Sequence, residues 1–177
     1  MFDPSVVFFP VILPSNEQVK RALDILGMTH DNFLCAYCGA TASEWDHLRP
    51  LVLDKRPTGY ISEIHNLVPS CGKCNQSKGN KQWAAWMVSD APLSPKTRGV
   101  EDLEQRMQRL SAYEKWLEPT KMDFEKILGH EKWTRHWNNC DQVQSLMKQA
   151  QIHAAEINKM VAEAYKRYNP YKAPVRQ

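Results

Sequence analysis

The stretch from Cys35 to Lys78 decides the fold, and it reads CAYCGATASEWDHLRPLVLDKRPTGYISEIHNLVPSCGKCNQSK. A C-x-x-C pair stands near each end, formed by Cys35 with Cys38 and by Cys71 with Cys74. Four thiolates can hold Zn²⁺ in a closed tetrahedral site, and such a zinc is structural because no position is open for catalysis. We therefore predict a structural zinc site. The alternative is four reduced cysteines without a metal.

The residues between the cysteine pairs predict two strands followed by a helix. We expect a first strand from Glu44 through the apolar residues up to 53, a turn at 57–59 and a second strand over 60–68. A short helix should then run from the second cysteine pair through Lys78 and end at Gly79. The fold class that follows is α+β, with a small strand–strand–helix core tied together by the cysteines.

Four polar residues in this stretch suit phosphodiester hydrolysis. That reaction needs a base for water, charge neutralisation on the phosphate and stabilisation of the leaving oxygen. His47 is the natural base because imidazole titrates near neutral pH. The amide oxygen of Asn66 can fix the tautomer of that imidazole, although a backbone carbonyl can do the same. Asp46 and Asn75 offer hard oxygen ligands, which suit Mg²⁺ rather than zinc.

Taken together, these residues resemble the HNH endonucleases, whose site is the ββα-metal fold. The resemblance is carried by Asp46-His47-x-x-Pro50, Gly59 and Asn66-Leu67-x-x-x-Cys71-x-x-Cys74-Asn75-x-x-Lys78-Gly79. Two features depart from the family pattern. Asn75 stands where many members have histidine, and Gly59 stands where two glycines are often found. Neither departure removes a group that the chemistry needs.

The resemblance implies a role for each matched residue. His47 would be the general base, and Asp46 and Asn75 would hold a catalytic Mg²⁺ or Mn²⁺. Asn66 would constrain the active-site loop and the histidine. The zinc-bearing branch of the family implies structural zinc on the four cysteines. DNA would be the substrate, cut to leave 5′-phosphate and 3′-hydroxyl ends.

Positive charge concentrates around this stretch. From His47 to Arg98 there are eight basic and three acidic residues, whereas the whole chain carries a formal charge of only +3. Such an excess favours a polyanionic partner, and the alternative is an ordinary solvated surface. The candidate phosphate contacts are Arg49, Lys73, Lys78 and Lys81.

The flanking regions are predicted to be mainly helical. We expect an extended arm over 1–14, with a strand at Val6–Phe9, and helices over 16–27, 81–89, 101–117, 121–128 and 140–168. Asn80 is the expected cap of the helix over 81–89, whose tryptophans suit a core. The predicted organisation is an N-terminal arm and helix at 1–30, an HNH domain at 31–90, a linker at 91–100 and a helical region at 101–177, with a loose tail after Tyr168.

The last helix carries an apolar seam with a heptad spacing. The seam residues are Val143, Leu146, Ala150, His153, Ile157, Met160 and Ala164. Two interpretations remain open. The helix can pack antiparallel on the helix over 101–117, or it can form the interface of a homodimer.

The remaining features bound the class of protein. No apolar run approaches the roughly 20 residues that cross a membrane, and the N-terminus lacks the features of a signal peptide. Five cysteines in a cytoplasmic protein favour metal binding over disulfides. The leading hypothesis is a metal-dependent DNA endonuclease, active in restriction, anti-phage defence or a mobile element. The alternatives are a non-catalytic zinc module that binds DNA or protein, and an RNA-directed nuclease.

Overall fold

The computed structural model describes residues 10–168 and divides the chain between Asp123 and Phe124 into two compact units. The predicted strand at Val6–Phe9 and the predicted loose tail after Tyr168 lie outside the described residues.

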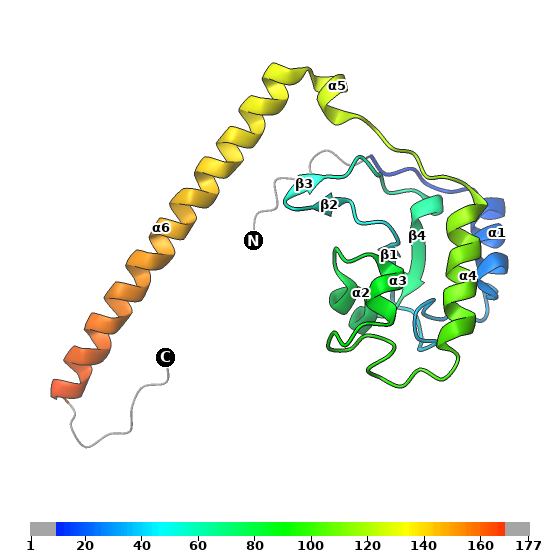
Figure 1. Cartoon of the computed structure of the whole chain (residues 1–177), viewed down its shortest axis with the longest axis horizontal. Helices are drawn as coiled ribbons and strands as arrows, with labels where there is room; N and C mark the ends of the chain where they lie inside the picture. The colour runs from blue at the N-terminus through cyan, green and yellow to red at the C-terminus, as the bar shows by residue number, and fades with distance from the viewer. Residues whose placement is uncertain (1–9, 169–177) are drawn as a thin grey trace. The chain divides into compact units, whose positions relative to one another are not determined.

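At the centre of the first unit, two antiparallel strands are followed by a helix (Figure 1). β1 (Glu44–His47) pairs with β4 (Leu67–Ser70), and His47 lies opposite Leu67. α2 (Gly72–Lys78) follows β4 directly, and its backbone ends at Gly79, whose φ is 50°. The predicted α+β class and the order of strand, strand and helix are therefore confirmed.

The predicted strands differ from the observed ones between Leu48 and Asn66. β2 (Val52–Leu53) and β3 (Arg56–Pro57) form a separate small hairpin, which turns through Asp54 and Lys55. Both turn residues have positive φ, as a tight two-residue hairpin turn requires. The first predicted strand is thus too long, because its apolar second half belongs to another hairpin.

The second predicted strand also begins too early. The chain forms a 3₁₀ turn, η2 (Ile64–Asn66), before it enters β4. The hydroxyl of Tyr113 donates to the carbonyls of Ile64 and Leu67, at 2.7 Å to Leu67. This contact from a distant helix holds the turn, and apolar alternation in the local sequence cannot indicate it.

Two helices cover one side of this centre. α1 (Asn16–Leu26) begins with a capping box at Ser15 and ends at Gly27, whose φ is 71°. α4 (Leu103–Trp116) packs beside α1 and against η2. Its Leu110 and Tyr113 are buried in the same core as the apolar face of α1.

α3 (Trp83–Met87) contributes its tryptophans to the core, as expected. The helix begins later than predicted, because the side chain of Gln82 accepts from the backbone N–H of Ala85 and so supplies the cap in place of Asn80.

The segment 91–100 is not the predicted linker. Ser94 and Pro95 are buried, and Arg98 donates to the sulfur of Cys74 at 2.8 Å. α4 therefore belongs to the same compact unit as the cysteine-bound core, and the division of the chain comes after Asp123.

The chain after α4 runs back along the core. The backbone N–H of Met122 donates to the carbonyl of Gly59 at 2.8 Å. A Cβ on Gly59 would meet the carbonyl of Met122 at 2.6 Å, so this close approach requires glycine.

The second unit consists of α5 (Phe124–Leu128) and α6 (His130–Tyr168), which are joined at Gly129. α6 has 39 residues and begins ten residues before the predicted start at 140, because the polar turns ahead of the heptad seam are helical too. Its seam is exposed, and the buried face of α4 is already occupied by α1 and η2. Over the described part of the chain, no helix is both long and apolar enough to span a membrane.

Candidate functional site

The four paired cysteines form one cluster. Their sulfur atoms all lie within 4.8 Å of one another, and the sulfurs of Cys38 and Cys71 are 3.7 Å apart. A tetrahedral zinc with Zn–S bonds of about 2.3 Å needs sulfur separations of about 3.8 Å. None of the cysteines in the described residues forms a disulfide. The cluster therefore fits zinc, and it joins the loop before β1 to the start of α2.

The ionisation of the cluster also favours a bound cation. Hydrogen bonding to Cys38 raises the pKa of the Cys35 thiol to about 11, while the same contact holds the pKa of Cys38 well below its usual value. One thiolate thus makes its neighbours harder to ionise, because like charges repel at this distance. A divalent cation would remove that conflict and allow all four sulfurs to be thiolates.

Two arginines approach the cluster from outside. Arg98 donates to the sulfur of Cys74, and Arg106 donates from Nη1 to the carbonyl of Cys35 at 3.2 Å. Four thiolates around Zn²⁺ leave a net charge of −2, so a neighbouring guanidinium partly neutralises the site. These contacts explain why the segment 91–100 and the start of α4 pack on the cluster.

Asp46 and Lys78 form a buried ion pair next to this cluster. Asp46 is 5% exposed and Lys78 is 0% exposed, and Lys78 Nζ lies 3.1 Å from Asp46 Oδ2. Tyr37 Oη donates to the same carboxylate oxygen at 2.6 Å. Burial lowers the pKa of Lys78, and the Asp46 carboxylate opposes that shift. Since two buried charges are tolerable only as a pair, neither can be lost without a large cost.

Lys78 therefore cannot be the phosphate contact that the sequence predicted. Its ammonium group also donates to the carbonyl of His47 at 2.7 Å and to that of Gly79 at 3.3 Å. The prediction was wrong because it took a lysine near the end of a short helix to be solvated. In the structure, this side chain reaches from α2 to the end of β1.

The imidazole of His47 is held by a residue that the sequence did not indicate. His47 Nε2 and Ser62 Oγ are 3.0 Å apart. Burial lowers the pKa of His47 below its ordinary value, against the opposing effect of Asp46. The ring is therefore neutral at neutral pH, which is the protonation state that a general base requires.

Asn66 acts on the backbone that follows His47. Its side chain is fully buried, and Oδ1 accepts from the N–H of Arg49 at 2.8 Å while Nδ2 donates to the carbonyl of Arg49 at 3.1 Å. The backbone carbonyl of Asn66 accepts from the N–H of Leu48 at 2.8 Å. The structure thus places the Asn66 amide on the loop, and Ser62 on the imidazole.

Asn75 lies on α2, three residues before Lys78, so the two side chains share a face of the helix. Among the described residues, its side-chain amide has no hydrogen-bond partner, and the residue is partly exposed. Asp46 Oδ1 receives only a 3.4 Å contact from Lys78 and so keeps acceptor capacity. Carboxylate and amide oxygens are the ligands that Mg²⁺ prefers, so a divalent cation on Asp46 and Asn75 stays a prediction.

The other predicted phosphate contacts differ in whether their side chains already bind other groups of the protein. Arg49 lies 3.3 Å from a carboxylate oxygen of Glu114 and stacks over the ring of Tyr60 at 5.7 Å. Lys81 is exposed and donates to the carbonyl of Ser77 at 2.8 Å, near the end of α2. Lys73 is exposed on the same helix. A phosphate at Arg49 would therefore compete with Glu114, whereas Lys73 presents its charge to solvent.

Tyr37, Ser62 and Glu114 were missed by sequence reasoning, and the reason differs between them. Tyr37 lies between Cys35 and Cys38, and this position in the sequence could have indicated that its side chain is buried beside the cysteines. Ser62 and Glu114 contact the site only through the tertiary fold, so no local pattern reveals them.

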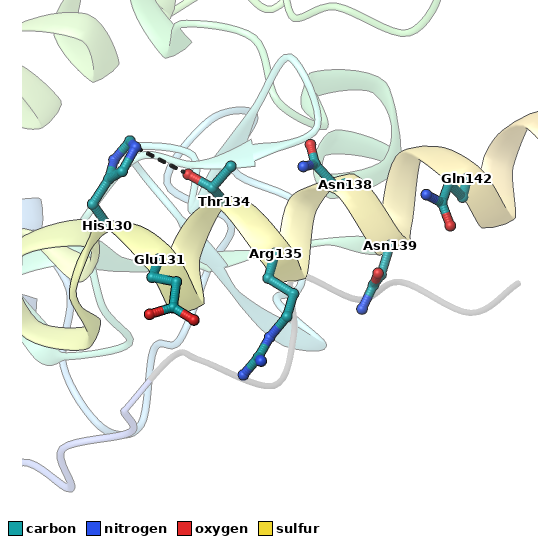
Figure 2. Close-up of a pocket in the computed structure, with 7 residues that line it drawn as sticks. All are labelled: His130, Glu131, Thr134, Arg135, Asn138, Asn139 and Gln142. Carbon is teal, nitrogen blue, oxygen red and sulfur yellow. Dashed lines mark hydrogen bonds between the residues drawn. The ribbon is translucent and has the colours of Figure 1, made fainter.

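A shallow hollow of about 510 Å³ lies on the second unit, and its lining residues all come from α6 between His130 and Gln142 (Figure 2). His130 Nε2 and Thr134 Oγ1 lie 3.5 Å apart, and Figure 2 marks this hydrogen bond with a dashed line. Within the described part of the chain, the only group of three or more metal-ligating side chains is the cysteine cluster. The hollow therefore does not compete with the first unit as the functional site.

Comparison with known proteins finds matches to the cysteine-bound part of the first unit. A family model described as HNH endonuclease matches residues 35–81. Residues 35–81 are therefore similar to an HNH endonuclease domain. It is also 42% identical over 59 residues to the CRISPR-associated endonuclease Cas9 of Corynebacterium diphtheriae, a span that covers 31% of this chain and 5% of that protein. No solved structure matches.

We expect Cys71→Ser to lose the metal and Cys140→Ser to keep it, because Cys140 lies on α6 and outside the cluster. The measurement is zinc released per chain when the purified protein is treated with a thiol-blocking mercurial and a zinc-sensitive dye. Wild type and Cys140→Ser should each release close to one zinc. Equal release from both variants would contradict the four-cysteine site.

The ion pair gives a second prediction. Lys78→Ala leaves the Asp46 carboxylate buried without its cation, so it should lower the free energy of unfolding by about 3–5 kcal/mol. Lys73→Ala removes an exposed lysine from the same helix and should change it by less than about 0.5 kcal/mol. Urea denaturation with zinc present measures both, and similar values for the two variants would rule out a structural role for the ion pair.

Proposed function

We propose that this chain is an endonuclease that hydrolyses DNA phosphodiester bonds, with His47 as the general base. The observation that carries the proposal is the fixed, neutral imidazole beside the Asp46–Lys78 pair. Ser62 holds the ring, Lys78 holds the backbone carbonyl of the same residue, and Asn66 holds the loop behind it. The HNH match over 35–81 supports the same chemistry.

In the proposed reaction, His47 takes a proton from a water molecule whose oxygen attacks the phosphorus. The bond from phosphorus to the 3′ oxygen then breaks, which leaves a 5′-phosphate and a 3′-hydroxyl. Asp46 and Asn75 would hold a Mg²⁺ or Mn²⁺ ion, which when bound stabilises negative charge on the leaving oxygen. Asp46 keeps its orientation through Tyr37 and Lys78.

Lys78 is, in this account, a positioning residue rather than a substrate contact. Its ammonium group donates to the carbonyl of His47 at the end of β1. This contact would keep the His47 backbone in place when the phosphate of the substrate binds. The structural zinc has the corresponding task at the other end of the domain, since it fixes the start of α2 on which Asn75 lies. Lys73, Lys81 and Arg49 would meet the DNA backbone.

The biological setting that we propose is restriction, anti-phage defence or a mobile element, in the reducing cytoplasm that keeps the cluster cysteines from forming disulfides. The choice of DNA over RNA rests on the resemblance to the HNH endonucleases, because the name of the matched relative says endonuclease without naming the nucleic acid. Duplex DNA and duplex RNA of the same sequence, digested in parallel, distinguish these substrates.

Nicking of supercoiled plasmid tests the proposed base. Wild type should cut with Mg²⁺ or Mn²⁺ and stop with EDTA, and His47→Ala should cut at least about 100-fold more slowly because the proton acceptor is gone. The control is His30→Ala, which removes an exposed histidine outside residues 35–81. If His47→Ala, folded and zinc-loaded, cuts as fast as His30→Ala, the role given to His47 is wrong. Binding of DNA without cleavage in any metal would favour a non-catalytic zinc module.

A further inference from the structure

The long helix of the second unit exposes more apolar surface than a solvated helix needs. Among the described residues of α6, Trp137 is the one buried side chain. Large apolar side chains are exposed along the following five turns, among them Leu146 at 64%, Met160 at 69% and Val161 at 61%. Helices in proteins are stabilised mainly by packing of an apolar face, so a helix of 39 residues with this face exposed needs a partner.

We infer that α6 pairs with α6 of a second copy of this chain, in an antiparallel coiled coil centred between residues 151 and 152. The seam follows the heptad spacing of three and four residues from Val143 to Met160. At the rise of 1.5 Å per residue, this seam is about 26 Å long. The inference concerns the second unit alone and does not depend on the proposed nuclease activity.

The identity of the seam residues favours the antiparallel arrangement. In a parallel pair each residue meets its own copy, so Ala150 would face alanine and His153 would face histidine in successive central layers. The alanine layer would leave a void, and the histidine layer would bury two polar rings against each other.

Antiparallel pairing removes both problems at once. About the proposed centre, the small Ala150 meets the partner's His153, which fills the space that alanine leaves. Leu146 then meets the partner's Ile157, and Val143 meets the partner's Met160. The six layers between Val143 and Met160 are thereby filled, and each pairs residues of different size or shape.

The flanking positions also accept this register. Glu156 falls opposite the partner's Gln149, and Glu163 falls opposite the partner's Gln142, so carboxylates face amides and not one another. On the other flank, Met147 meets the partner's Ala154. Within one helix, His153 Nδ1 already lies 3.8 Å from Glu156 Oε2, so the imidazole that enters the seam has a polar neighbour on its own chain.

The arrangement has a geometric consequence. The His130 ends of the two helices would lie about 65 Å apart, at opposite ends of the pair, because each is about 21 residues from the centre. A parallel pair would instead bring both ends together.

The first test is the mass of the full chain in solution by light scattering. Wild type should have twice the 20.5 kDa of one chain. Leu146→Glu combined with Ile157→Glu places charge in the seam and should weaken dimerisation by more than about 100-fold. The matched control, Ser145→Glu combined with Asn158→Glu, adds the same charge on exposed positions outside the seam and should remain dimeric.

The second test is the register. A photoreactive benzoylphenylalanine at position 146 is introduced into ¹⁵N-labelled chain, which is mixed with unlabelled chain and irradiated. We expect it to link to the unlabelled tryptic peptide 149–159, which contains Ile157. A link to the peptide 136–148, which contains position 146 itself, would overturn the antiparallel register. A monomeric wild type, or a dimer that the seam variant does not weaken, would overturn the inference as a whole.

Discussion

The ion pair between Lys78 and Asp46 is the interaction on which the site depends. It joins the last turn of α2 to the end of β1 inside a part of the protein from which water is excluded. Each charge is tolerated there only because the other is present, since an unpaired buried charge costs several kcal/mol. The Lys78 ammonium group also donates to the carbonyl of His47, so its position is fixed by two partners. The position of the proposed base is therefore tied to the pair.

Two further constraints hold this arrangement from outside. The cysteine cluster joins the loop before β1 to the start of α2, so both elements of the ion pair begin from one fixed point. Tyr113 and Asn66 hold the turn before β4 and the loop after His47, through buried hydrogen bonds to backbone groups. Because the strands are only four residues long, such contacts must supply the order that a larger sheet would give by itself.

The sequence was sufficient to predict the parts of the fold that have a fixed spacing. The cysteine pairs and the Asp46-His47 dipeptide each act over a few residues, so their geometry follows from local order. The errors share another cause. Lys78 was predicted to be solvated, but it pairs with the distant Asp46. The segment 91–100 was predicted to be a linker, but its Arg98 contacts Cys74. Residues 60–68 were predicted to form one strand, but Tyr113 holds part of them in a turn. Long-range contacts of this kind override local propensity, and a single sequence carries no signal for them.

The central claim is that the ordered site in 35–81 hydrolyses DNA, and end-group analysis tests it most directly. Zinc-loaded wild-type protein is incubated with an end-labelled DNA duplex and Mg²⁺, and the new ends are examined with phosphatase, kinase and ligase. The account predicts metal-dependent products with 5′-phosphate and 3′-hydroxyl ends. Intact duplex after incubation with folded, zinc-loaded protein in Mg²⁺ and in Mn²⁺, or products with 3′-phosphate ends, would contradict it.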